Sequence, residues 1–428
     1  MAIHSRLLVT TFAKGRPPTL DRALWAAAIA LIGLGAVLFA ALLEELAASM
    51  PAGVHHDFLA FFAAGRLVLQ GRSADLYDAS ALTAIQRTVI PTPVGANGYM
   101  PFINPPFAAV AFAPIAALPA QAARAAWAIL SLAVLALAGA WIARPLATRQ
   151  RIATALLITL SFPAYHSLAE GQWSAVMLLG GVAALAAARR GSWGLAGLAL
   201  ATWWLKPQLL VLPLLALALD RRWAAIGWAI LGGALLTLVS VPFVGVGIYG
   251  QYVGYLLEVA ASHFNGAGAV VQSVWQGDLA TSEGLNGMLV GYLGQRAVAT
   301  VDLLWAGLAA GLVMLWLAAA AVERPGFGTL PARRMVAAGV GIVLLVNPNL
   351  FVQDCVLVFL LLPALWPLQV RDYWRISIGV SALAAVVLLD QWPGTHLFTI
   401  VLAAVVVSVC VPTIMSKRGS HRWALAAP

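Results

Sequence analysis

The sequence predicts an all-α polytopic membrane protein with about twelve transmembrane segments, both termini in the cytoplasm and two large extracytoplasmic loops. Composition is the first reason. Of the 428 residues, 62% are hydrophobic and only 10% are charged, and the mean hydropathy is +0.90, which is far more apolar than a globular domain. The second reason is pattern: apolar runs alternate with clusters of Lys and Arg, which mark the cytoplasmic side of a membrane protein.

The predicted segments follow the apolar runs in chain order. A polar cytoplasmic N-terminus, residues 1–22, precedes the first span at residues 23–43, and a long polar loop at residues 44–106 comes next. A short apolar helix at residues 107–118 belongs to the outer side, and a second long loop is expected at residues 244–299. The other segments are predicted at residues 122–143, 152–168, 173–188, 195–205, 207–219, 223–243, 300–322, 335–346, 356–368, 376–389 and 396–412, before a cytoplasmic tail at 416–428.

The charges are distributed as this topology requires. Of the 25 Lys and Arg residues, 19 fall in segments that the topology places in the cytoplasm, whereas 12 of the 16 Asp and Glu residues fall elsewhere. The formal net charge of +9 is therefore explained by topology, and nucleic-acid binding is not predicted. If residues 107–118 were a full span, the basic clusters at 144–151, 189–190 and 221–222 would lie outside, so we reject that alternative.

Lys206 is the most unusual residue of these apolar runs. It interrupts the run of residues 195–219, and a lysine in hydrocarbon is costly unless it faces a cavity or a partner. Basic residues lie at both ends of the run, at 189–190 and 221–222, and a single span cannot begin and end on the same side. The run is therefore predicted to form a hairpin of two short helices with Lys206-Pro207-Gln208 at its outer apex. Helices this short cannot cross about 30 Å of hydrocarbon, which indicates a cavity in the outer half of the bilayer.

The first outer loop brings an acidic residue to this cavity. Asp57 immediately precedes an apolar stretch that contains Arg66, and the pattern predicts an amphipathic helix along the membrane surface. From spacing alone, Asp57 is either a helix N-cap or a catalytic group. His56 beside it is either a loop residue or a substrate ligand. No spacing of His, Cys, Asp or Glu is typical of a metal site, so no metal or cofactor is predicted.

Five stretches, taken in order, resemble glycosyltransferase family 87, the polyprenyl-phosphate-dependent membrane enzymes of the GT-C superfamily that include phosphatidylinositol-mannoside mannosyltransferases. The stretches are DFLAFFAAGRLVLQGRSADLYD (57–78), NPPFAAVAFAPIAALP (104–119), EGQWSAVMLLGGVAAL (170–185), LAGLALATWWLKPQLLVLPLLAL (195–217) and NPNLFVQDCVLVFLLLPAL (347–365). Each is mostly small and apolar and is weakly specific alone, but the ordered set runs through most of the chain.

The resemblance implies a GT-C type fold. It also implies transfer of a sugar from a polyprenyl-phosphate donor to a hydroxyl of a lipid or glycan acceptor, with inversion. The family has an essential aspartate near the start of the first loop, a role that falls on Asp57 as general base. Lys206 is expected to bind the donor phosphate, because a cation stabilises its charge as the glycosidic bond breaks. Arg66 is a second candidate for this role.

The remaining candidates for substrate binding lie in the first loop or at the outer ends of the spans. They are His56, Glu170, Gln172, Gln208 and Asp354. The family's mannosyltransferases have Ser-Trp-x-His close to the position of Asp354. This chain has Asn349-Leu350-Phe351-Val352-Gln353-Asp354 there, without the histidine, which leaves the sugar and the acceptor open.

The enzyme is predicted to lie in the plasma (inner) membrane, with its active site facing the periplasm or cell exterior. Residues 23–322 are expected to form the catalytic transmembrane module and residues 323–415 the C-terminal transmembrane helices. Two other function classes stay open: a secondary transporter, in which broken helices also surround charges, and a flippase for lipid-linked sugars. The charges gather at the outer face and no internal repeat is visible, which favours the enzyme.

Overall fold

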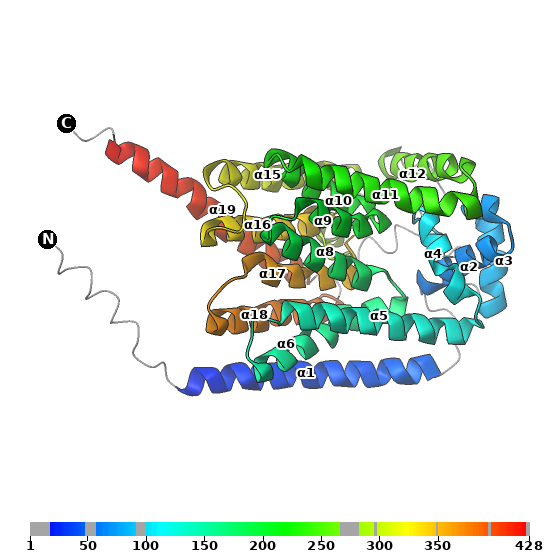
Figure 1. Cartoon of the computed structure of the whole chain (residues 1–428), viewed down its shortest axis with the longest axis horizontal. Helices are drawn as coiled ribbons and strands as arrows, with labels where there is room; N and C mark the ends of the chain where they lie inside the picture. The colour runs from blue at the N-terminus through cyan, green and yellow to red at the C-terminus, as the bar shows by residue number, and fades with distance from the viewer. Residues whose placement is uncertain are drawn as a thin grey trace.

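The structure, a computed structural model, describes residues 18–47, 57–90, 100–265, 282–294, 298–347, 350–392 and 395–424. Every regular element in these ranges is a helix. The first residues of α1 (Pro18–Ala47) and the last residues of α19 (Leu397–Ala424) lie at one end of the bundle, which we call the basal end (Figure 1). The opposite end, the loop end, carries elements of the two predicted loops, α2 (Asp57–Leu69), α3 (Ala79–Val89) and α12 (Gly247–Asn265), and the short outer helix α4 (Pro106–Ala116).

Within the described residues, six helices are long and apolar enough to cross a membrane, so the protein is a multi-pass membrane protein. They are α1, α5 (Ala120–Ile142), α11 (Trp223–Val244), α15 (Val298–Val322), α18 (Val370–Leu389) and α19. A seventh span results if α6 (Thr148–Thr159) and α7 (Phe162–Glu170), which are bent by 45° at their break, cross as one.

The other predicted segments are helical but short, with at most 17 residues. They are α8 (Ser174–Arg189), α9 (Trp193–Leu200) with the 3-10 helix η2 (Ala201–Leu205), α10 (Pro207–Leu219), α16 (Leu330–Val346), and the 3-10 helix η4 (Val352–Leu360) with α17 (Leu361–Leu365). Helices therefore occupy all twelve predicted positions, but twelve full spans are not shown.

The hairpin predicted around Lys206 is present. One arm is α9 continued by η2, the other is α10, and Lys206 is the single residue between them, with φ −136° and ψ 79°. Pro207 begins α10, where its fixed φ suits the first helical position. The two free ends of the arms meet again, because the guanidinium carbon of Arg222 lies 4.1 Å from the ring centre of Trp193. The chain therefore turns back at Lys206.

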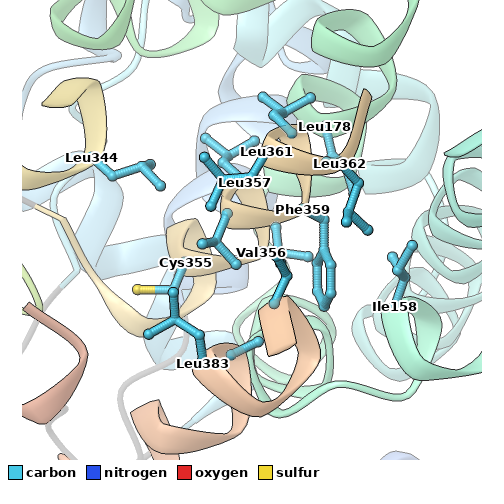
Figure 2. Close-up of a cluster of buried hydrophobic side chains, with 14 of the residues drawn as sticks. Ile158, Leu178, Leu344, Cys355, Val356, Leu357, Phe359, Leu361, Leu362 and Leu383 are labelled. Carbon is cyan, nitrogen blue, oxygen red and sulfur yellow. The ribbon is translucent and has the colours of Figure 1, made fainter. Parts of the chain in front are cut away.

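The largest apolar core surrounds η4 and α17 (Figure 2). Val356, Leu357 and Phe359 are completely buried there, and α8, α16 and α18 pack around them. Cys355 is buried in the same cluster and is not bonded to another cysteine, as its apolar surroundings in the sequence suggest. A core this tightly packed places the residues just before it, Gln353 and Asp354, on a rigid support.

The first predicted loop forms a folded subdomain. The surface position expected for α2 is wrong, because nine of its thirteen residues are buried. Its aromatic side chains pack into a second apolar cluster with α4; the rings of Phe61 and Phe112, for example, lie 5.8 Å apart. The apolar residues of α2 therefore face protein on all sides, and the helix carries Asp57 into the bundle.

Candidate active site

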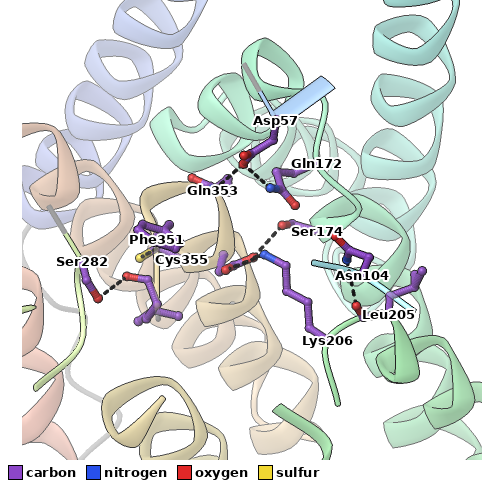
Figure 3. A network of polar contacts seen from close by, with 12 residues as sticks. Asp57, Asn104, Gln172, Ser174, Leu205, Lys206, Ser282, Phe351, Gln353 and Cys355 are labelled. Carbon is purple, nitrogen blue, oxygen red and sulfur yellow. Dashed lines mark hydrogen bonds and ion pairs between the residues drawn. The ribbon is translucent and has the colours of Figure 1, made fainter. Parts of the chain in front are cut away.

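Asp57 receives hydrogen bonds from two amide side chains (Figure 3). Gln172 donates Nε2–H to Asp57 Oδ2 in a short contact, and Gln353 Nε2 lies 3.4 Å from the same oxygen. The backbone N–H of Asp57 donates to Glu170 Oε2 at 3.2 Å. A helix N-terminus carries partial positive charge, so the start of α2 stabilises both carboxyl groups. Both amides are neutral, so they orient the carboxylate without forming an ion pair with it.

Lys206 forms a buried ion pair with Asp354 beside this group. Its Nζ lies 2.7 and 2.8 Å from the two carboxylate oxygens, and Ser174 Oγ donates to Oδ1 at 2.8 Å. The side chain of Asp354 is 0% exposed and that of Lys206 is 11% exposed. A buried lysine in a membrane protein requires a partner, and Asp354 is the partner of Lys206. An ammonium group has three donor hydrogens, and the two carboxylate contacts leave one for a ligand.

The two groups are supported by the same two turns of the chain. The turn that follows α7 provides Gln172 to Asp57 and Ser174 to Asp354. The turn that begins η4 provides Gln353 to Asp57 and its neighbour Asp354 to Lys206. A displacement of either turn would thus move both groups. We call this set of six residues the paired network: Asp57, Gln172, Ser174, Lys206, Gln353 and Asp354.

Gly171 allows α2 to approach the turn that follows α7. Its φ is +72°, a left-handed conformation that favours glycine. A Cβ atom there would lie 2.7 Å from the Cβ of Phe58 in α2. Trp127 of α5 fixes the turn from the other side, because its Nε1 donates to the Gly171 carbonyl at 2.8 Å. The contact between Gln172 and Asp57 depends on this close approach.

A second support holds the apex of the hairpin. Asn104 Nδ2 donates to the Leu205 carbonyl at 3.0 Å, directly before Lys206, and Tyr77 Oη donates to the Asn104 carbonyl at 2.9 Å. Burial raises the pKa of Tyr77 well above its usual range, so the phenol stays a neutral donor. Residues of the first loop thereby position Lys206, although more than a hundred residues separate them in the chain.

The model of glycosyltransferase family 87 matches residues 102–348, which is more than half of the chain. The chain belongs to glycosyltransferase family 87. No curated protein and no solved structure matches it. The matched range of this glycosyltransferase includes Gln172, Ser174 and Lys206. Asp57, Gln353 and Asp354 lie outside that range, and the fold brings them to it.

The other predicted site residues are placed as follows. Glu170 lies at the Asp57 amide, whereas Gln208 is exposed at the first turn of α10. Arg66 is two and a half turns along α2 from Asp57, about 13 Å, where it donates to the Leu118 carbonyl at 3.0 Å and lies over the ring of Phe62. It is not part of the paired network. His56 lies outside the described residues.

Two members of the paired network were not predicted as site residues. Ser174 and Gln353 have uncharged side chains in apolar surroundings, and nothing in the sequence marks them as site residues. Only their neighbours Gln172 and Asp354 were predicted to bind substrate. Within the described ranges, no group of three or more His, Cys, Asp or Glu residues is arranged to hold a metal ion.

Proposed function

We propose that this glycosyltransferase transfers a monosaccharide from a polyprenyl-phosphate donor to a hydroxyl of a lipid or glycan acceptor, with inversion, at the extracytoplasmic face of the plasma membrane. One observation supports this proposal above all. Asp57 is held by Gln172 and Gln353 at the start of a buried helix, and Asp354, the neighbour of Gln353, pairs with Lys206. The positive-inside distribution of Lys and Arg supports the orientation, since Asp57 begins α2, an element of the loop end.

Asp57 is the general base of the proposed reaction. It takes the proton of the acceptor hydroxyl while the hydroxyl oxygen forms its bond to the anomeric carbon of the sugar. The bond from that carbon to the phosphate oxygen breaks in the same displacement, and polyprenyl phosphate leaves with the electron pair. A single displacement inverts the anomeric centre. The two amides on Asp57 Oδ2 fix the carboxylate at the position where the hydroxyl must be deprotonated.

Lys206 binds the donor phosphate in this proposal. Two of its hydrogens contact Asp354, and the third is available for a phosphate oxygen as negative charge develops there. The first turn of α10, next in the chain, adds the backbone N–H of Gln208 and the positive end of a helix dipole; Pro207 has no N–H, and the N–H of Leu209 donates to the Lys206 carbonyl. Glu170, Gln172, Gln208 and Asp354 are the further residues proposed to contact or order the substrates. Residues 23–322 would form the catalytic module, completed by the 353–354 turn.

The test is Asp57→Asn in the purified full-length protein, with a radiolabelled polyprenyl-phosphate sugar as donor. Asn retains the shape and hydrogen-bonding acceptor but is far less basic, so we expect turnover to fall by about 10²–10⁴-fold with donor binding near normal. Asp78→Asn is the matched control: Asp78 caps α3 by accepting from the Ala81 amide at 2.8 Å, and Asn caps equally well. Equal turnover of the two variants would remove Asp57 from the chemistry.

Comparison of Asp57→Asn with the wild type also distinguishes an enzyme from a flippase of lipid-linked sugars. A flippase must bind and move the lipid but needs no base. Unchanged lipid translocation by Asp57→Asn in proteoliposomes, together with no sugar transfer by the wild-type protein, would favour the flippase. We expect the opposite result: sugar transfer by the wild type that depends on Asp57.

A further inference from the structure

The arms of the Lys206 hairpin enclose an apolar cavity of about 190 Å³ together with α8, α15 and α16. A single water needs only about 10–15 Å³, so this space is large enough for part of a substantial molecule. Among its described lining residues, Asp220 is the only charged one; Ala184, Leu200, Leu212 and Val340 are typical of the rest. An occupant must therefore be hydrocarbon for most of its length, and any polar part of it must lie at the Asp220 end.

The Asp220 end of the cavity carries arginines held on aromatic rings. Arg222 lies 4.1 Å from the ring centre of Trp193, and Arg189 lies 5.2 Å from that of Phe327; both rings line the cavity. Arg222 Nε also donates to Asp220 Oδ2 at 2.7 Å, which neutralises the one acidic group of the lining. The positive charge of Arg189 remains.

Arg189 is held in place without an anionic partner among the described residues. A second ring, that of Trp366, lies 4.9 Å from its guanidinium carbon, so two aromatic side chains hold the group. Its Nε and Nη2 have no hydrogen-bond partner among the described residues. A guanidinium group with unpaired donors, stacked on a ring that lines an apolar cavity, matches a phosphate attached to a hydrocarbon chain.

We propose that this cavity binds one anionic phospholipid of the cytoplasmic leaflet, with an acyl chain between the hairpin arms and the phosphate at Arg189 and Arg222. Basic pockets between membrane helices on the cytoplasmic side are suited to such headgroups. Arg189 follows Ser174 by fifteen residues of α8, about 22 Å along the helix. The site is therefore distinct from the paired network and does not rest on the proposed sugar transfer.

A lipid substrate of the catalytic reaction fits this cavity less well than a structural lipid. Its phosphate would have to lie at Lys206, but Leu200, Trp203 and Leu360 line the apex end of the cavity and neither Lys206 nor Asp354 does. Arg189 and Arg222 do not line the cavity either, but the rings on which they lie, Phe327 and Trp193, do. An occupant with its phosphate at the basal end has no such obstacle. It would hold the two arms apart, so its binding should stabilise the hairpin.

The experiment uses the full-length protein, stripped of lipid in mild detergent and then titrated with phosphatidylglycerol. Phosphatidylcholine with the same acyl chains and inorganic phosphate are the two ligand controls. Native mass spectrometry measures bound lipid and a thermal scan measures Tm. We expect one phosphatidylglycerol per protein and a rise in Tm of about 3 °C, with little effect of either control.

Variants test each half of the site. Arg189→Gln/Arg222→Gln should weaken phosphatidylglycerol binding roughly thirtyfold, at about fivefold for each charge. Ala184→Leu and Ala216→Leu fill the cavity without changing a charge and should also reduce binding. Arg149→Gln, an exposed arginine on α6, is the matched control and should bind like wild type. Equal binding of phosphatidylcholine, an equal effect of inorganic phosphate, or wild-type binding by the folded variants would each overturn the proposal.

Discussion

The two ends of the Lys206 hairpin hold their positive charges in different ways. At the apex, Lys206 is paired with a completely buried carboxylate that a serine also orders. At the base, Arg222 is 40% exposed, and both Arg222 and Arg189 lie on aromatic rings. The apex cation is thus held by a buried carboxylate, whereas the basal cations lie on aromatic rings and, within the described ranges, only Arg222 has an acidic partner, the partly exposed Asp220.

This difference predicts how each end responds to substitution. Breaking a buried pair leaves the other ion without compensation, whereas an exposed charge loses little when it is removed. It also predicts different uses. The apex can present one fixed hydrogen to a ligand, while the planar guanidinium groups of the base can bind a phosphate through several donors.

The test with the largest expected effect asks which side of the membrane the apex and the base of the Lys206 hairpin each face. Single cysteines at Gln208 and Arg190, both exposed, mark the apex and the base. An impermeant maleimide added to intact cells should label Gln208→Cys and not Arg190→Cys, an all-or-none difference. Background labelling should be low because the native Cys355 and Cys410 are buried. Labelling of both positions from outside would contradict the hairpin topology.

Lys206→Met should have the largest effect on stability. It leaves the Asp354 carboxylate buried without its cation, which costs about 3–5 kcal/mol. Arg222→Gln at the base should change stability by about 0.5 kcal/mol or less. Denaturant titration of both variants measures this contrast directly.

The double variant Lys206→Met/Asp354→Leu separates stability from binding. Replacing both ions by apolar groups should recover most of the lost stability. If Lys206 also contacts the donor phosphate, the double variant will be stable yet bind donor more than tenfold more weakly than wild type. Normal donor affinity in that variant would assign Lys206 to the ion pair alone.

Gln353→Ala and Gln172→Ala should have intermediate effects on turnover. Each removes one amide from Asp57 Oδ2, and a hydrogen bond to a charged group contributes about 1.5–3 kcal/mol. We therefore expect kcat to fall about tenfold to a hundredfold, with little change in KM for the donor. A matched change in KM and none in kcat would indicate substrate contact instead of orientation of the base.

Glu283 offers the smallest and most specific test, because it is a buried acid of the second predicted loop, residues 244–299, and takes part in no ion pair of the described residues. Burial, with a smaller contribution from Asp390, raises its pKa to about 9. The folded protein therefore favours the neutral form. Its contribution to stability is complete below the unfolded pKa near 4.3 and is lost as pH rises through 9.

Glu283→Gln should remove that dependence, since the amide stays neutral. We expect the Tm of the wild type to fall between pH 5 and pH 9 and that of Glu283→Gln to fall less. Glu258→Gln, at an exposed position of α12, is the control and should follow the wild type. Parallel Tm curves for all three proteins would show that Glu283 is ionised in the folded state.

Much of the fold could be predicted because hydrocarbon imposes strict rules on sequence. The apolar runs fixed the positions of the helices, and basic residues on both sides of residues 195–219 predicted the hairpin before any contact was known. The surface position of α2 could not be corrected from its own residues. Phe58, Phe61 and Phe62 are compatible with lipid or with protein, and only α4 shows which of the two they meet.

The sequence by itself determined the class of membrane protein, the family resemblance, the hairpin and the two residues, Asp57 and Lys206, at which a charge in apolar surroundings demanded an explanation. Only the tertiary structure decided their partners. Asp57 meets Gln353 across 296 positions and Lys206 meets Asp354 across 148. The physical reason is that a charge within an apolar run is visible in the local sequence. The group that pairs with it is whichever distant side chain the packing brings within hydrogen-bonding distance.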